Sequence, residues 1–428
     1  MLCFPYAPIT GQPEGFWRTN NLARQLLGQT AVRGALGQST MQARSSNSNG
    51  GTLPMKPNLV VETLRTATVA LLIGAVVGVI GLSTAHADKG GIPGEVEAHE
   101  IVNGYSFTIV YEKSLPGRPG APSINSSSAI AFFDRGVGIR VVDGDNSRLI
   151  EPKEDDQNIY GQNSAVINDA GFVAYYFQKK NCDQPTQSCG GIILNDGRRR
   201  EIVVDPNDPL VPGSQISEPT LNNRRDVAFG LNDRVNRAAY VYVISRKDTQ
   251  ILGPNLGGPF AISDSGHVLL SAVTPEPPYQ WSFVLFAKGE LTSVASFDLS
   301  KVGFGSAAMN NAGKVVFCTN PSAGGETQGM LYSWENGRLE QIAPISRCGA
   351  VAINDSGQVV VSTYDELLTL EEGRLVRILR AGDHLFGRTV EGFEFGRFNS
   401  GLNDSGQLAL NVSFSDSHVI LVSRVELH

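Results

Sequence analysis

The acidic residues that recur along the chain are the first candidates for chemistry. Asp169, Asp264, Asp355 and Asp404 each follow an Asn or Ser and stand two residues before a Gly. Carboxylates brought together from separate segments could bind calcium or act as a general acid and base. A calcium loop, however, assembles several oxygen ligands, and each of these segments offers a single acid. We therefore predict no metal site here and interpret these residues as parts of structural turns.

The second candidates for function are aromatic. Tyr279 and Trp281 lie in a proline-rich segment, residues 275–281. Their rings could stack on a sugar or on a partner protein, because aromatic side chains offer large, flat contact surfaces. Packing over the edge of a sheet is the alternative interpretation. We predict Tyr279 and Trp281 as binding residues.

Established catalytic motifs are absent from the sequence. It contains no Gly-x-Ser-x-Gly elbow, Walker loop, dinucleotide-binding fingerprint or His-Glu-x-x-His pair. The histidines after residue 88 are scattered singly. No catalytic residue and no cofactor is therefore predicted.

The recurrent acids belong to seven copies of one turn. Asn at the first position can bond to the backbone, and Gly at the fourth position takes the positive φ that follows a type I turn. The copies begin at Asn125, Asn168, Asn222, Ser263, Asn310, Asn354 and Asn403. The glycines of the regular copies are Gly171, Gly266, Gly313, Gly357 and Gly406. Ser128 and Arg225 replace glycine in the first and third copies.

The spacing of these turns predicts the architecture. They are separated by 41 to 54 residues, and a second hairpin follows the first in nearly every copy. Four short antiparallel strands per unit at this spacing are typical of the blades of a β-propeller. We predict an all-β propeller of about seven four-stranded blades, with six or eight as alternatives. The N-terminal strand at residues 106–111 is expected to complete the last blade and close the ring.

At these turns the chain resembles the bacterial exported proteins with tandem NxxGxxAF repeats. The resemblance extends over about residues 105–425 and is strongest at Asn168, Asn310, Asn354 and Asn403. It implies a propeller-like β-structure and an exported protein. The family has no settled activity, so the resemblance implies no substrate.

An export signal precedes the repeats. Residues 67–82 are strongly apolar, Arg65 stands before them, and Ala85-His86-Ala87 forms a small-x-small site. This pattern predicts a signal peptide at residues 55–87, cleaved after Ala87, with an uncleaved anchor as the alternative. Residues 1–54 are interpreted as a disordered leader or as a start site placed too early. The propeller domain is then residues 88–428, secreted or periplasmic.

The cysteines agree with export. Beyond the signal, the chain contains Cys182, Cys189, Cys318 and Cys348. An even number suits an oxidising compartment, so we predict two disulfides, Cys182–Cys189 and Cys318–Cys348, with free thiols as the alternative. No pair has the Cys-x-x-Cys spacing of a zinc site.

Charge narrows the range of partners. The whole chain has a formal net charge of −7, and its first 87 residues hold six Lys and Arg but only two acids, so the remainder is at −11. This balance argues against nucleic acid or an anionic membrane. We expect an exported, monomeric, non-catalytic propeller that binds a protein or a glycan through loops on one face. The alternatives are a propeller glycoside hydrolase or lyase with channel carboxylates, and a purely structural envelope protein.

Overall fold

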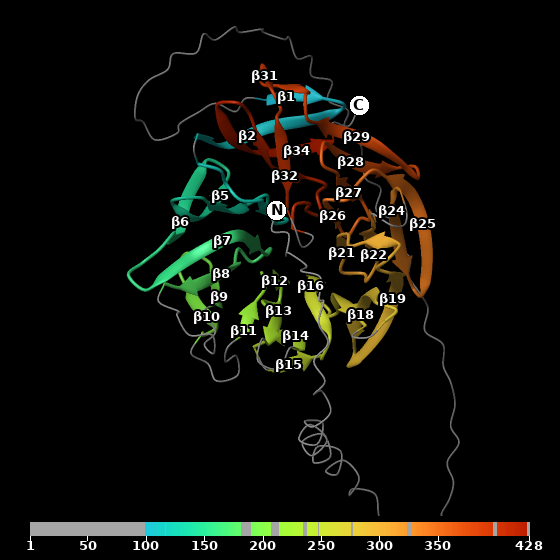
Figure 1. Ribbon diagram of the computed structural model, residues 1–428. Coiled ribbons are helices and arrows are strands. Elements are labelled where there is room, and N and C mark those ends of the chain that lie inside the picture. Colours follow the sequence, from blue (N-terminus) through green and yellow to red (C-terminus); the bar gives the residue numbers. More distant parts are fainter. Residues whose placement is uncertain are drawn as a thin grey trace, which may run out of the picture. The chain divides into compact units, whose positions relative to one another are not determined.

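The computed structural model describes residues 99–115, 117–180, 190–206, 214–233, 238–246, 248–274, 277–322, 327–396 and 400–425 (Figure 1). All of them belong to the unit Asp88–His428. The predicted leader, the signal peptide and the Cys182–Cys189 pair lie outside the described residues. Within the described ranges there is no helix with the length and apolar character needed to cross a membrane.

The described chain is all-β, and its sheets form the seven blades of a β-propeller, as predicted. The first three blades follow in chain order around the ring (Figure 1). Blade 1 consists of β3 (Ser123–Ile124), β4 (Ile130–Asp134), β5 (Gly138–Asp143) and β6 (Asn146–Pro152). Blade 2 consists of β7 (Asn158–Ile167), β8 (Val173–Lys179), β9 (Gly190–Asn195) and β10 (Arg200–Val204). Blade 3 consists of β11 (Ser214–Ile216), β12 (Thr220–Leu221), β13 (Val227–Asp233), β14 (Ala238–Ile244) and β15 (Thr249–Leu252).

The next three blades repeat the pattern. Blade 4 consists of β16 (Leu256–Ile262), β17 (Val268–Val273), β18 (Gln280–Ala287) and β19 (Glu290–Asp298). Blade 5 consists of β21 (Ala307–Met309), β22 (Val315–Cys318), β24 (Gly329–Glu335) and β25 (Arg338–Ile345). Blade 6 consists of β26 (Ala350–Ile353), β27 (Val359–Ser362), β28 (Glu366–Glu371) and β29 (Arg374–Arg380). Two small ribbons lie between blades: β20 (Val302–Gly303) pairs with β23 (Asn320–Pro321), and β30 (His384–Leu385) with β31 (Arg388–Thr389).

The last sheet combines both ends of the described chain. Blade 7 contains β32 (Gly392–Phe395), β33 (Leu408–Ser413) and β34 (Ser417–Val425), followed by β2 (Tyr105–Ser114) and β1 (His99–Val102). β2 pairs with β34 from Tyr105↔Val425 to Ser114↔Ser417. Side chains of β2 also reach blade 1, where the buried carboxylate of Asp134 accepts hydrogen bonds from Tyr111 and Lys113.

The core is divided among the junctions between blades. Each of seven hydrophobic clusters spans two neighbouring blades. Between blades 7 and 1, for example, Ile124 and Phe132 pack against Ala409 and Ile420. This explains the nearly continuous apolar strands such as β27, because a blade is covered on both faces.

The antiparallel strand order gives the propeller two different faces. The seven repeated turns join the first and second strands of each blade at one face, which we call the turn face. The connections between second and third strands, and from blade to blade, lie at the opposite face, which we call the loop face. The described part of the proline-rich segment, residues 277–281, belongs to the connection between β17 and β18 and to the start of β18 on the loop face.

Candidate functional site

Each Asn of the turn face organises its own hairpin. In the second copy, Gly171 N donates to Asn168 O at 2.9 Å, and Asn168 Oδ1 accepts from Phe172 N at 2.9 Å. The turn therefore contains both a backbone hydrogen bond and a side-chain hydrogen bond. Gly171 has a φ of 77°, as the sequence pattern predicts.

The same asparagines also connect neighbouring blades. Asn Nδ2 of one turn donates to the carbonyl of the first residue in the next turn, over 2.9–3.2 Å. We call this series the asparagine ladder. Its members are Asn125, Asn168, Asn222, Asn310, Asn354 and Asn403, all buried. An amide is required at these positions, because the side chain must accept within its own turn and donate to the next.

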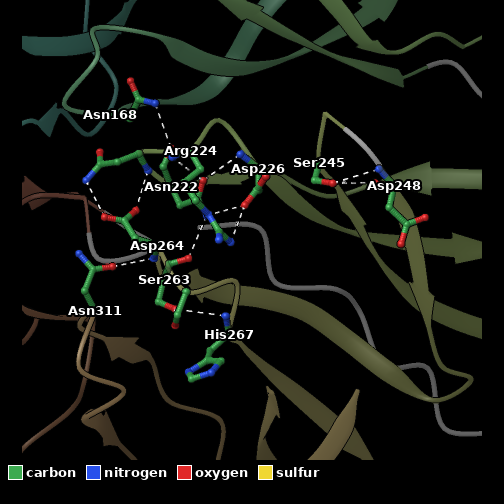
Figure 2. A network of polar contacts seen from close by, with 12 residues as sticks. Asn168, Asn222, Arg224, Asp226, Ser245, Asp248, Ser263, Asp264, His267 and Asn311 are labelled. Carbon is green, nitrogen blue, oxygen red and sulfur yellow. Dashed lines mark hydrogen bonds and ion pairs between the residues drawn. The ribbon is translucent and has the colours of Figure 1, made fainter. Parts of the chain in front are cut away.

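The recurrent acids have an equivalent role at the second turn position. Backbone N–H groups at Ser126, Asp169, Asn223, Asp264, Asn311 and Asp355 each donate to Oδ1 of the next turn, over 2.7–2.9 Å. Figure 2 shows this for Asp264, whose N–H points to Asn311. Thus the carboxylates that looked like candidate ligands bond to the backbone of the preceding blade.

One copy of the turn keeps the backbone contact from Asp264 N to Asn311 Oδ1 but has no asparagine to contribute to the asparagine ladder. In the fourth copy Ser263 replaces Asn, and its Oγ contacts Ser265 Oγ and His267 N (Figure 2). The turn itself is kept, since Gly266 N donates to Ser263 O at 2.9 Å. A serine side chain is too short to bridge to Asn310, so the asparagine ladder is interrupted between blades 4 and 5.

The two copies without glycine keep the turn at a conformational cost. Ser128 and Arg225 both have a φ of 70°, in the left-handed region that disfavours L-residues with a side chain. Arg225 places its guanidinium over the Phe172 ring at 4.6 Å, which offsets part of this cost. The packing of the blades therefore imposes the turn conformation on Ser128 and Arg225, although this φ is unfavourable for both residue types.

The seven turns surround the end of the central channel. A cavity of about 120 Å³ is lined by the Asn residues, the second turn residues and the apolar residue that precedes each turn. Burial, followed by the charges of Asp355, Asp169 and Asp264, raises the pKa of Asp404. Carboxylates of four blades therefore converge on one channel mouth. Among the described residues, no group of three or more His, Cys, Asp or Glu is placed to hold a metal ion.

The two aromatic residues predicted to bind, Tyr279 and Trp281, differ in solvent exposure. Tyr279 is 52% exposed, whereas Trp281 is 0% exposed and is the second residue of β18. The Trp281 ring packs against Phe283 at 4.4 Å, and Trp281 pairs with Phe297 on β19. The prediction that Trp281 offers a binding surface was therefore wrong. Strand β18 begins at Gln280, so Trp281 already lies inside a blade junction.

Two further aromatic rings on this face were missed in the sequence. Phe304, in the connection from blade 4 to blade 5, is 53% exposed, and Tyr364, in the β27–β28 connection, is 58% exposed. The Phe304 ring packs against Trp281 in a tilted arrangement with the ring centroids 4.9 Å apart, and the Arg347 guanidinium lies 4.5 Å from the Tyr364 centroid. The available signal for Phe304 was its position between Gly303 and Gly305, in a loop.

The predicted Cys318–Cys348 disulfide is present and fixes this part of the loop face. It joins blade 5 to the connection that leads into blade 6, with a Cα–Cα distance of 6.1 Å. Asn320 adds a second clamp, because its Oδ1 accepts from Cys348 N at 2.7 Å and its Nδ2 donates to Phe304 O. The connection that carries Phe304 is thus tied to blade 5 and to the segment that leads into blade 6.

No protein-family model and no curated protein matches this chain. Among solved structures, the chain is similar to an oligogalacturonate lyase in complex with manganese, with 10% identity over 76% of this chain and 94% of that chain, and a TM-score of 0.51. It is also similar to YCF48 from Cyanidioschyzon merolae (11% identity, 75% and 99% covered, TM-score 0.43). A prolyl endopeptidase structure matches with 13% identity over 71% and 46%, and a TM-score of 0.45. At such low identity the similarity to the lyase supports the fold alone, a β-propeller.

Proposed function

We propose that this chain is an exported binding propeller that takes a protein or a glycan on its loop face. The observation that supports this is the position of the exposed aromatic rings. Among the described residues these are Tyr279, Phe304 and Tyr364, and all three lie in loop-face connections of blades 4 to 6. Other exposed large apolar residues, such as Leu149 and Leu339, lie singly on outer strands.

The physical argument is one of cost and preorganisation. An exposed aromatic ring leaves apolar surface in water, and several such rings on one face of a protein are typical of interaction sites. Loops on a rigid propeller are also the usual place for binding residues. For the connection that carries Phe304, the Cys318–Cys348 bridge and the Asn320 contacts reduce the entropy that would be lost on binding.

Export and the repeat family are part of the same proposal. The signal pattern before Asp88 and the tandem turns support an exported protein of the NxxGxxAF type. The Cys318–Cys348 disulfide supports it further, since disulfides persist in oxidising compartments. Intact mass and N-terminal sequencing of the exported protein would test the site after Ala87.

The binding proposal is tested with variants in a combined glycan and cell-surface protein screen. Tyr279→Ala, Phe304→Ala and Tyr364→Ala are compared with Leu339→Ala, which removes an exposed side chain from the outer strand β25. We expect at least one loop-face variant to weaken binding while Leu339→Ala binds like the unmodified protein. Binding that is unchanged by all three loop-face variants would exclude this face.

The second candidate function is catalysis by carboxylates at the channel, as in a glycoside hydrolase or lyase. The convergence of Asp169, Asp264, Asp355 and Asp404 on one channel mouth favours it. Asp404, with its raised pKa, is the residue best suited to proton transfer. Oligosaccharide cleavage by the purified protein, lost in Asp404→Asn without loss of folding, would support this candidate. No cleavage across a panel of neutral and uronate-containing polysaccharides would count against it.

A further inference from the structure

We infer that the part of the loop face around Tyr279 and Phe304 binds an uncharged sugar chain. This inference rests on the proposed function and specifies its ligand. The site, which we call the aromatic patch, consists of Tyr279 and Phe304 with Asp298, Ser300 and Ser322 at its rim. The exposed rings supply flat apolar surfaces, and the rim supplies hydrogen-bonding oxygens.

Both rings of the aromatic patch stand on fixed backbone. Tyr279 O accepts from Leu299 N at 3.1 Å, and Thr274 closes the loop before it through its contacts with Pro278 O and Gln280 N. These contacts join the two segments that enter the patch, so that Tyr279 is placed beside the start of the connection that carries Phe304. The ring of Tyr279 is therefore exposed although the backbone on either side of it is held by hydrogen bonds.

Phe304 is fixed from a different direction. Its ring lies on buried Trp281 at 4.9 Å, and its carbonyl accepts from Asn320 Nδ2. The next residue, Gly305, leaves no room for a side chain, because a Cβ there would lie 1.6 Å from Cys318 O. A ligand that stacks on Phe304 consequently meets a ring already held in place, which lowers the entropy cost of binding.

The rim of the aromatic patch offers acceptors whose own donors are already used. Ser300 donates through both N and Oγ to Asp298 Oδ1, at 2.9 and 2.7 Å. Ser322 Oγ donates to Ser300 O at 3.4 Å. Among the described residues, no donor contacts Asp298 Oδ2, so this oxygen and the lone pairs of the two hydroxyls can accept hydrogen bonds from a ligand. The ligand must therefore bring many donors, as a polyhydroxylated sugar does, whereas an extended peptide offers one backbone N–H per residue.

Charge selects a neutral sugar. Hydrogen bonds from Ser300, followed by the charge of neighbouring Lys301, lower the pKa of Asp298 and so favour its ionised form. An acidic sugar would approach an ionised carboxylate on a protein that is itself acidic. A neutral pyranose can instead place its C–H face on a ring and its hydroxyls on the rim. This combination of apolar face and hydroxyl edge matches the aromatic patch.

The experiment uses the purified full chain and a panel of neutral and uronate oligosaccharides, with binding measured by titration calorimetry. Phe304→Ala and Tyr279→Ala should each weaken binding of a neutral oligosaccharide roughly 3- to 10-fold, the effect of losing one aromatic contact. Asp298→Asn should weaken it about fivefold through the lost charged acceptor. Phe304→Tyr, which keeps the ring, should lose less binding than Phe304→Ala, and Leu339→Ala on the outer strand β25 is the control that should bind normally.

The outcomes separate this inference from the proposed function. Binding of neutral sugars that depends on Tyr364 and not on the aromatic patch would overturn the inference and leave the loop face as the binding site. The same conclusion would follow if displayed peptides, but no sugars, bound in a manner that depends on Tyr279 and Phe304. If neither sugars nor peptides and proteins bind through any loop-face aromatic residue, both proposals fail.

Discussion

Asn403 Nδ2 donates to Asn125 O at 2.9 Å, which links two residues 278 positions apart in the chain. The contact joins the turn of blade 7 to that of blade 1. With it, the asparagine ladder runs without interruption from Asn310, through the junction of the chain's two ends, to Ser263. Blades 7 and 1 are thus joined in two places. One is the contact between Asn403 and Asn125 at the channel, and the other is the contact of Tyr111 and Lys113 on β2 with Asp134 of blade 1.

We predict that Asn403→Ala destabilises the protein by about 1 to 3 kcal/mol, because a buried amide loses its hydrogen bonds to Asn125 O and from Gln407 N. Asn403 Oδ1 also accepts from Gln407 N at 2.9 Å, so both the turn and the junction lose a bond. The measurement is urea-induced unfolding followed by fluorescence. Asn403→Asp provides the control, since it keeps the acceptor and loses the donor. Its loss of stability should become smaller at acidic pH, where the new side chain is protonated and can donate again.

The interruption at Ser263 predicts a stabilising substitution. Ser263→Asn should supply the missing donor to Asn310 O and raise the free energy of unfolding by about 1 kcal/mol. The other six turns accommodate Asn in the same backbone geometry, so no rearrangement is needed. Ser263→Ala is the matched control and should destabilise, because His267 N loses its acceptor. A Ser263→Asn variant no more stable than the unmodified protein would show that the blade 4–5 junction does not need the ladder.

The positive φ of the turn glycines predicts that substitution by alanine lowers stability. Gly357 has a φ of 86° and open space around the position of a Cβ, so Gly357→Ala tests conformational strain alone. We expect a loss of about 1 to 2 kcal/mol. Gly392 is equally open but has no positive φ in the left-handed region, so Gly392→Ala should change stability little. Equal effects of the two substitutions in thermal unfolding would argue against strain as the cause.

The fold could be predicted from sequence because its main signal is local. Asn354 and Gly357 define a turn within four residues, and the repetition of that turn gives the blade spacing. The ladder could not be predicted in the same way. The hydrogen bond from Asn354 Nδ2 to Asn403 O crosses 49 residues, and it exists only because the ring brings equivalent turns side by side.

The candidate site was harder to predict for a related reason. Tyr279 and Trp281 share a segment and a residue class, yet one is exposed and the other is buried. The difference depends on where β18 begins and on the Phe304 and Phe283 rings that cover Trp281, which are contacts made between strands and blades. Composition and local pattern contain no information of this kind.

The Cys318–Cys348 bridge predicts a dependence on redox conditions. It closes a segment of 30 residues, and removal of such a crosslink costs about 3.5 kcal/mol in the chain-entropy model. The double variant Cys318→Ser/Cys348→Ser should therefore unfold at a lower urea concentration than the unmodified protein. Reductant should lower the stability of the unmodified protein toward that of the variant. If the midpoint of the unmodified protein were the same with and without reductant, the bridge would contribute no stability.

Asp404 predicts how stability depends on pH. Burial and the carboxylates of Asp355, Asp169 and Asp264 raise the pKa of Asp404 in the folded protein above its ordinary value of 3.8. The folded state then binds a proton more tightly than the unfolded state, so ionisation of Asp404 lowers stability as the pH rises from about 3.8 through the raised value.

Asp404→Asn removes this ionisation and keeps an Oδ1 acceptor for Asp355 N. We expect the variant to gain stability relative to the unmodified protein on going from acidic to neutral pH, measured by urea unfolding across that range. Asp156→Asn, in the exposed connection between β6 and β7, is the control and should leave the pH profile unchanged. A profile for Asp404→Asn parallel to that of the unmodified protein would show that the channel carboxylates do not repel one another.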